Sequence, residues 1–214
     1  PEMTGEETFH PDAQLEALRP TADGASLAKN FPVTMMNERK MKARYGQMDS
    51  WQALELAFKG DEMSFVAILP PPDTFLESEQ KLDAPLWSRL LQSLKSEDEV
   101  FVMLPKFKLE TTVEAHANVG ILSTLGMAEA FKPDAADFSR MTATPGIFIG
   151  AIHHKAFIEV KEDGAEAAAA TVVECLQSCE SDSPGFEANR PFLWAIVHKP
   201  SGTILFMGRL ADPR

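Results

Sequence analysis

Apolar segments typical of β-strands, separated by turns instead of regularly spaced helices, constrain this fold most strongly. Each segment is bounded by charged residues, glycine or proline, which is the pattern of a strand between turns. The predicted strands are Phe31–Met36, Met41–Met48, Trp51–Phe58, Met63–Leu69, Glu99–Thr112, Ile147–Lys161, Pro191–His198 and Thr203–Leu210. Because strand and helix do not alternate regularly, the sequence predicts an α+β fold and not a doubly wound one.

Helical spacing interrupts this strand pattern in two places. Leucines recur at helical intervals over about 84–96, and Val113–Leu125 returns to the same spacing with Gly126 as a predicted C-terminal cap. The turns Lys59–Glu62 and Lys199–Gly202 each join two predicted strands as a hairpin. Three tryptophans lie on apolar segments and are expected in the core: Trp51, Trp87 and Trp194.

An acidic surplus limits the partners that this chain can have. The formal net charge is -12, and hydrophobic residues make up 44% of the chain, within the range of a folded globular protein. Nucleic acids and anionic membranes attract a basic face, so we expect neither as a partner. No apolar run approaches the roughly 20 residues that a membrane-spanning helix needs.

The sequence lacks the residue patterns of common catalytic and metal sites. His153 and His154 are adjacent on a predicted strand, so their side chains point to opposite faces and cannot both bind one metal ion. Cys175 and Cys179, with His154 as a base, would suggest a thiol nucleophile, but no flanking signature accompanies the cysteines. There is also no G-x-S-x-G motif and no phosphate-binding glycine loop. We therefore expect no metal, no cofactor and no enzymatic activity.

The segment Lys161–Gly185 has conflicting local preferences. Ala167–Ala170 is the strongest helix-forming run in the chain, whereas Thr171–Val173 directly after it favours a strand. An ordinary alanine-rich helix is one interpretation. The other is a segment that changes its conformation.

Several stretches, in the same order along the chain, resemble the serpin family. The hinge-like stretch Glu162–Thr171 resembles the proximal hinge of the inhibitory members. The other matching stretches are Val33–Met36, Leu104–Phe107, His154–Phe157, Phe186–Ile196, Thr203–Arg209 and Pro213. Together they resemble only the C-terminal half of a serpin, from about Phe9 onward. The chain departs from the family at Trp194, in an apparent insertion over 15–30, and in a slightly longer loop after the hinge.

This resemblance implies a fold and a function. Residues 1–214 would form the C-terminal part of a single serpin domain, with mixed and antiparallel β-sheets, a few helices and an exposed reactive-centre loop over about 162–185. The protein would be a suicide inhibitor and not an enzyme: a protease cleaves the loop, and the loop then inserts as a strand into sheet A. The uncleaved fold would be metastable and held by kinetics.

The composition of the hinge suits such an insertion. The resemblance assigns the hinge to Glu162, Gly164, Ala165, Glu166, Ala167, Ala168, Ala169, Ala170 and Thr171. Because side chains alternate along a strand, the face that starts at Ala165 carries only alanines and Thr171, while Glu166 lies on the opposite face. A buried Lys or Arg on the first face would cost several kcal/mol and block insertion. Gly164 supplies backbone freedom where the loop must bend.

The resemblance also places the reactive bond and its supporting residues. Counting from the hinge puts the cleaved bond between Ser178 and Cys179, and counting back from the signature puts it about two residues later. Neither count places Lys or Arg before the bond, so an elastase-, chymotrypsin- or subtilisin-like protease is expected, with a cysteine protease as an alternative. Lys106 and Glu162 match an ion pair where the loop enters sheet A, and His154 matches a histidine beneath the centre of that sheet.

Three alternatives stay open at this point. Cys175 and Cys179 form a local disulfide or remain free thiols. Fully extended, four residues span about 13 Å, too far for a disulfide, so oxidation would oppose strand insertion. The chain is an inhibitor, or a non-inhibitory serpin that acts as a carrier, chaperone or storage protein, or a fragment that is inactive without its N-terminal half. The compartment is open, with a lean to the extracellular side.

Overall fold

The computed structural model describes residues 4–10, 31–116, 121–161 and 183–214, which form two compact units. Unit 1 consists of residues 1–107 and 160–214, and unit 2 of residues 108–159. Unit 1 is built around an eight-stranded sheet, whereas unit 2 contains most of a two-stranded sheet.

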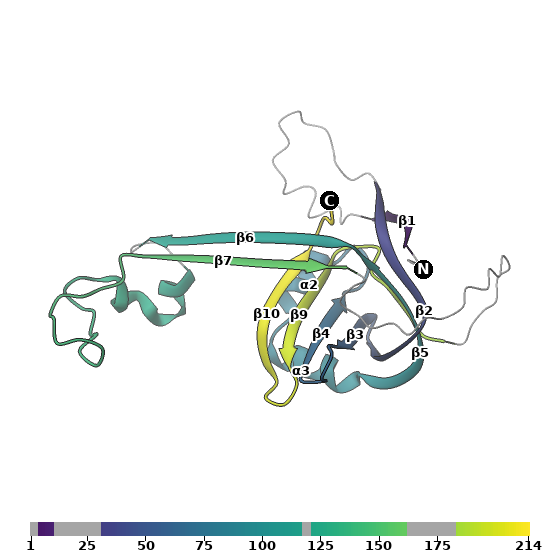
Figure 1. The fold of residues 1–214 in the computed structure, drawn as a ribbon, viewed down its shortest axis with the longest axis horizontal. Coiled ribbons are helices and arrows are strands. Elements are labelled where there is room, and N and C mark those ends of the chain that lie inside the picture. The colour runs from purple at the N-terminus through teal and green to yellow at the C-terminus, as the bar shows by residue number, and fades with distance from the viewer. Residues whose placement is uncertain (1–3, 11–30, 117–120, 162–182) are drawn as a thin grey trace. The chain divides into compact units, whose positions relative to one another are not determined.

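The sheet of unit 1 has the strand order β10-β9-β4-β3-β2-β5-β8, with β1 pairing β2 beside this path (Figure 1). The strands are β1 (Thr4–Phe9), β2 (Phe31–Met48), β3 (Trp51–Ala57), β4 (Met63–Leu69), β5 (Lys95–Pro105), β8 (Gly185–Glu187), β9 (Phe192–His198) and β10 (Thr203–Leu210). All of these pairs are antiparallel except β5 with β8, which is parallel. A mixed sheet with few helices confirms the predicted α+β class.

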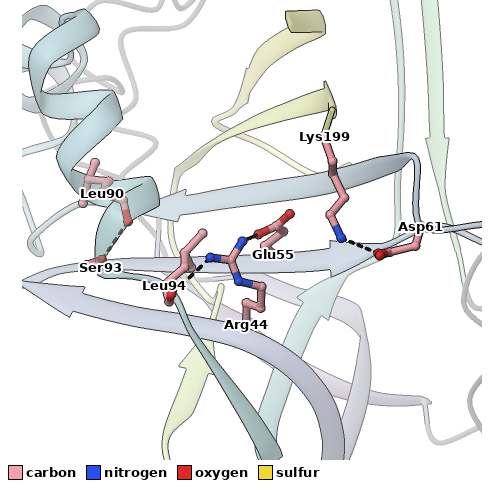
Figure 2. Close-up of polar contacts among 7 residues, drawn as sticks. All are labelled: Arg44, Glu55, Asp61, Leu90, Ser93, Leu94 and Lys199. Atoms are coloured by element: carbon pink, nitrogen blue, oxygen red, sulfur yellow. Dashed lines mark hydrogen bonds and ion pairs between the residues drawn. The ribbon is translucent and has the colours of Figure 1, made fainter. Parts of the chain in front are cut away.

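The two hairpins predicted from turn residues are both present. The turn between β3 and β4 contains Gly60 at φ 92°, and the turn between β9 and β10 contains Gly202 at φ 67°. Lys199 forms an ion pair with Asp61 between these turns (Figure 2), and its backbone N–H donates to the Glu62 carbonyl at 2.8 Å. The hairpins thus lie side by side through the pairing of β4 with β9.

The predicted break between Phe31–Met36 and Met41–Met48 is wrong, because β2 runs unbroken through the charged residues between them. Its pairing with β5 shifts register on both sides of Met41. Opposite charges face one another across the two strands, since Lys40 contacts Glu99 at 2.8 Å and Lys42 contacts Asp98 at 3.5 Å. Cross-strand pairs of this kind let a charged stretch remain in a strand.

Two helices cover one face of this sheet. Helix α3 (Ala84–Ser93) begins at Asp83, whose carboxylate accepts a hydrogen bond from the Leu86 N–H at 2.8 Å, a typical N-cap. It ends before the predicted limit because β5 starts at Lys95. Helix α2 (Phe75–Lys81) was not predicted. The core beneath them contains Trp51, Val66, Ile68, Phe75, Leu90, Leu193, Ala195 and Val197, with Trp87 partly buried against it.

No helix in the described part of the chain is long and apolar enough to cross a bilayer.

The first thirty residues also contain structure that the sequence did not predict. Strand β1 pairs with β2 from Thr4 opposite Met36 to Phe9 opposite Phe31. Phe9 is fully buried and packs with Val33 and Met103 in a second, smaller core. One buried aromatic residue therefore fixes a strand whose other residues are mostly polar.

The helix predicted over Val113–Leu125 is wrong over Val113–His116, which belongs to a strand. The long strand predicted before it is instead split: β5 ends at Pro105, which has no N–H for a ladder hydrogen bond, and β6 (Phe107–His116) follows. Ile121 and Leu122 are helical, and the helical turns η1 (Ser123–Met127) and η2 (Ala128–Phe131) follow them. Gly126, the predicted cap, has a positive φ of 103° and interrupts them.

An ion pair between β2 and β3 fixes the start of β5. Arg44 contacts Glu55, whose side chain is only 7% exposed, and its Nη2 also donates to the Leu94 carbonyl at the end of α3 at 3.2 Å (Figure 2). The guanidinium therefore satisfies both a buried carboxylate and a helix C-terminus.

We expect Arg44→Ala to lower the free energy of unfolding by about 1–3 kcal/mol, because Glu55 is left buried without its partner. The Arg44 side chain is 42% exposed, so solvent screening keeps the loss below that of a fully buried pair. Lys40→Ala removes an exposed ion pair of the same strand and should cost only ~0–1 kcal/mol. Urea unfolding curves compare the two, and equal losses would contradict this role for Arg44.

Candidate functional site

The predicted reactive-centre loop joins two strands that belong to different sheets. It leaves β7 (Ala151–Val160) and returns to β8 at Gly185, the last residue of the predicted loop and the first of the strand. The predicted hinge residues Glu162–Thr171 and the predicted reactive bond Ser178–Cys179 lie outside the described residues, as does Cys175. The structure therefore describes the two supports of this loop, which are the strand before it, β7, and the strand after it, β8.

The support after the loop is firmly held by β5. Strand β8 pairs parallel to β5, with Gly185 opposite Phe101. The Phe101 N–H donates to the Pro184 carbonyl at 2.9 Å, and Phe186 is fully buried. Chain downstream of the loop is thus anchored by backbone hydrogen bonds and by a buried aromatic side chain.

The support before the loop is the two-stranded sheet of β6 and β7, whose strands run in opposite directions (Figure 1). Lys155 of β7 pairs with Glu110 of β6, and the Lys108 ammonium lies 5.2 Å from the centre of the Phe157 ring. Within the described part of the chain, β7 pairs with β6 alone, so its other edge carries no strand. An unpaired edge presents backbone donors and acceptors to which a further strand can bind.

The two faces of β7 differ in polarity. Ile152, Ala156 and Ile158 alternate as half-buried residues on one face. His154 belongs to the same alternation and is exposed, whereas His153 belongs to the opposite one. His154 is thus a polar residue on an otherwise apolar strand face. Among the residues that the structure describes, no group of His, Cys, Asp or Glu is arranged to hold a metal ion.

Lys106 lies at the junction of β5 and β6. Its backbone N–H donates to the Thr34 carbonyl of β2 at 3.0 Å. The next residue, Phe107, is 4% exposed and packs against Phe192 and Trp194, with ring centres 6.2 and 6.4 Å apart. The start of β6 is therefore fixed to the core of unit 1. The predicted pairing of Lys106 with Glu162 stays a prediction, since Glu162 lies outside the described residues.

Trp194 lies at the centre of this aromatic cluster. It stacks on Phe65 at 6.3 Å and is 7% exposed, which confirms its predicted place in the core. Gly208 is opposite it on β10, and a Cβ atom at Gly208 would lie 2.6 Å from the indole ring. The sequence reasoning gave Gly208 no role, although a glycine inside a strand pattern signals a close approach of this kind.

Comparison with known proteins identifies the family. The family model of the serpins, the serine protease inhibitors, matches residues 2–213. Because this match spans nearly the whole chain, the chain belongs to the serpin family. Its mixed sheet and few helices agree with this.

Individual relatives and solved structures agree with this. The chain is 36% identical over 172 residues to an uncharacterised serpin-like protein of Methanosarcina acetivorans, covering 80% of this chain and 40% of that protein. It is 38% identical over 192 residues to the human leukocyte elastase inhibitor, and this match covers 85% of this chain and 49% of that protein. The thermophilic serpin tengpin in its native state superposes with a TM-score of 0.73 at 26% identity, covering 98% of this chain and 50% of tengpin. Maspin superposes with a TM-score of 0.75 at 26% sequence identity, and the match covers 98% of this chain and 52% of maspin. The chain spans about half the length of these proteins.

Proposed function

We propose that the protein inhibits a protease as a suicide substrate, through cleavage of its loop and insertion of the cleaved loop beside β7. One observation supports this most. The loop follows β7, which has an unpaired edge among the described residues, and the strand after the loop, β8, is paired with β5. Cleavage frees the hinge side to move with β7 and leaves the other side with β8. The similarity to a protein named leukocyte elastase inhibitor supports inhibition.

The proposed insertion uses the small face of the hinge. Ala165, Ala167 and Ala169 enter the sheet, while Glu166 stays on the opposite face. Each new ladder hydrogen bond contributes about 0.5–1.5 kcal/mol net. This free energy moves the acyl-linked protease and distorts its catalytic site. The inhibitor supplies no catalytic group of its own.

The proposed target follows from the residues near the reactive bond. Leu176 and Ser178 suit the binding pocket of an elastase-, chymotrypsin- or subtilisin-like serine protease, and a cysteine protease is the alternative. No Lys or Arg stands before the bond between Ser178 and Cys179, so a trypsin-like target does not fit.

We also propose that activity needs the other half of the serpin fold. Large apolar side chains are exposed on β10, where Phe206 is 48% and Met207 70% exposed. Unit 2 exposes Ile121 and Leu125 at 73% each. Exposed apolar surface of this extent indicates that another part of the protein covers it. Without that half, we propose that the chain is an inactive fragment.

A protease panel tests the proposal. The intact protein is incubated with elastase-, chymotrypsin-, subtilisin-, trypsin- and papain-like enzymes, and each mixture is analysed by denaturing gel electrophoresis. We expect a covalent complex with a member of the first three classes, and the loop to be cut between Ser178 and Cys179 or about two residues later. Cleavage by every enzyme without any complex would favour a non-inhibitory serpin.

Glu162→Ala should speed polymer formation on mild heating, because the proposed contact with Lys106 closes the entry point of the loop. An exposed ion pair contributes only ~0–1 kcal/mol, so the effect should appear mainly in the rate of opening. Light scattering at a fixed temperature measures it, with Glu166→Ala as the control from the same segment. Equal polymerisation rates for the wild type and Glu162→Ala would remove this role.

A further inference from the structure

A cavity of about 340 Å³ lies in unit 1 where three connections meet. Its walls are His10 after β1, Pro70–Asp73 between β4 and α2, Phe75 at the start of α2, and Asn189–Pro191 between β8 and β9. This volume falls within the roughly 300–1,000 Å³ of small-molecule sites, which combine apolar walls with a few convergent polar groups.

The walls of this cavity are preorganised. Three successive prolines, Pro70–Pro72, fix their backbone φ angles. Asp73 follows them at φ 58°, in the left-handed region, which aspartate adopts more readily than most residues. The His10 N–H donates to the Asn189 carbonyl at 2.8 Å and ties two of the three connections together.

Arg190 contributes a positive charge to the wall of the cavity. Its Nη2 donates to the Pro70 carbonyl at 3.3 Å, but its buried Nε finds no hydrogen-bond partner among the described residues. Burial lowers the pKa of Arg190, while the carboxylates of Glu187 and Asp73 oppose this shift. Arginine remains charged in proteins, and Arg190 lines the cavity, so a ligand carboxylate bound there would meet a guanidinium.

The charges around the cavity select the kind of ligand. Asp73 is exposed at the cavity wall, and both it and Glu187 act electrostatically on Arg190. These carboxylates repel a simple anion, and Arg190 repels a simple cation. A molecule with one charge of each sign satisfies both, and the proline rings with Phe75 offer apolar contact to its remainder. We propose that this cavity binds a free α-amino acid with an apolar side chain, its carboxylate on Arg190 and its ammonium on Asp73.

Ligand-observed NMR on the intact protein tests this with three probes: L-leucine, N-acetyl-L-leucine, which lacks the ammonium, and L-leucine amide, which lacks the carboxylate. We expect L-leucine to bind with a Kd below ~10 mM, and each blocked analogue to bind at least ~10-fold more weakly. No L-leucine binding up to ~10 mM, or equal binding of all three probes, would overturn the proposal. Tighter binding of either blocked analogue would overturn it as well.

Asp73→Asn supplies the matched variant, because asparagine tolerates the left-handed backbone and keeps the side-chain shape. It should weaken L-leucine binding by about 10-fold and leave N-acetyl-L-leucine unaffected. Asp49→Asn is the control, since Asp49 is also exposed and left-handed, at φ 49°, but lies outside the cavity wall. If both variants keep wild-type L-leucine binding, or both lose it equally, Asp73 does not receive the ammonium and the proposal fails.

Discussion

Under the proposed mechanism, Ala165→Arg should convert the protein from an inhibitor into a substrate. Ala165 is the first residue on the small face of the proposed hinge, and an arginine there must enter an apolar slot as the strand inserts. The reactive bond itself is unchanged, so the protease still cleaves the loop. Because insertion is slower, the acyl-enzyme hydrolyses first. We expect cleaved inhibitor and free active protease, measured as residual protease activity and as loss of the covalent complex.

Glu166→Arg is the matched control for this experiment. It introduces the same side chain one residue later, on the opposite strand face, and should leave most of the inhibition in place. Similar behaviour of the two variants would contradict the alternation that the proposed hinge requires. Stoichiometric trapping by Ala165→Arg would contradict it as well.

Gly208→Ala should destabilise the core by about 1–3 kcal/mol, which is the usual cost of overpacking. The added Cβ would lie 2.6 Å from a ring carbon of Trp194, a distance that real contacts do not reach. Trp194 cannot move freely, because it packs against Phe65 and Phe107. The midpoint of thermal unfolding at a fixed scan rate measures the change.

Two further variants separate this clash from a general effect of alanine. Gly150→Ala adds a Cβ with no atom within 4 Å and should be neutral, or stabilising by up to about 1 kcal/mol. Trp194→Phe removes the ring atoms that Gly208→Ala would strike, so the double variant should lose less stability than the two single losses combined. Additive losses would show that the two residues do not share this contact.

The sequence predicted best those elements whose signals are local. The β3–β4 and β9–β10 hairpins follow from turn residues between apolar runs, and α3 follows from leucine spacing. The continuity of β2 was not predictable in this way, because its charged centre is stabilised by partners on β5 that lie far along the chain. Strand β1 depends in the same manner on the burial of Phe9 by distant residues.

The two candidate sites differ in the same way: the hinge is one contiguous segment, whereas the cavity is formed by distant segments. The hinge stays a prediction that came from the resemblance of one contiguous stretch to the serpin hinge, and strand alternation and side-chain size, which agree with it, are both local properties. The cavity of Asp73 and Arg190 could not be predicted in this way, since its polar groups come from connections that only the folded sheet brings together. The strand Val113–His116 was mistaken for helix because spacing alone does not show that β7 pairs beside it.

Thermal stability before and after loop cleavage tests the proposed insertion most directly. The intact protein is cut once within residues 162–182 by a protease that it does not trap, and both forms are heated at the same scan rate. Several ladder hydrogen bonds at about 0.5–1.5 kcal/mol each should raise the unfolding midpoint of the cleaved form by more than ~10 °C. An unchanged or lower midpoint after cleavage would contradict insertion of the loop as a strand beside β7.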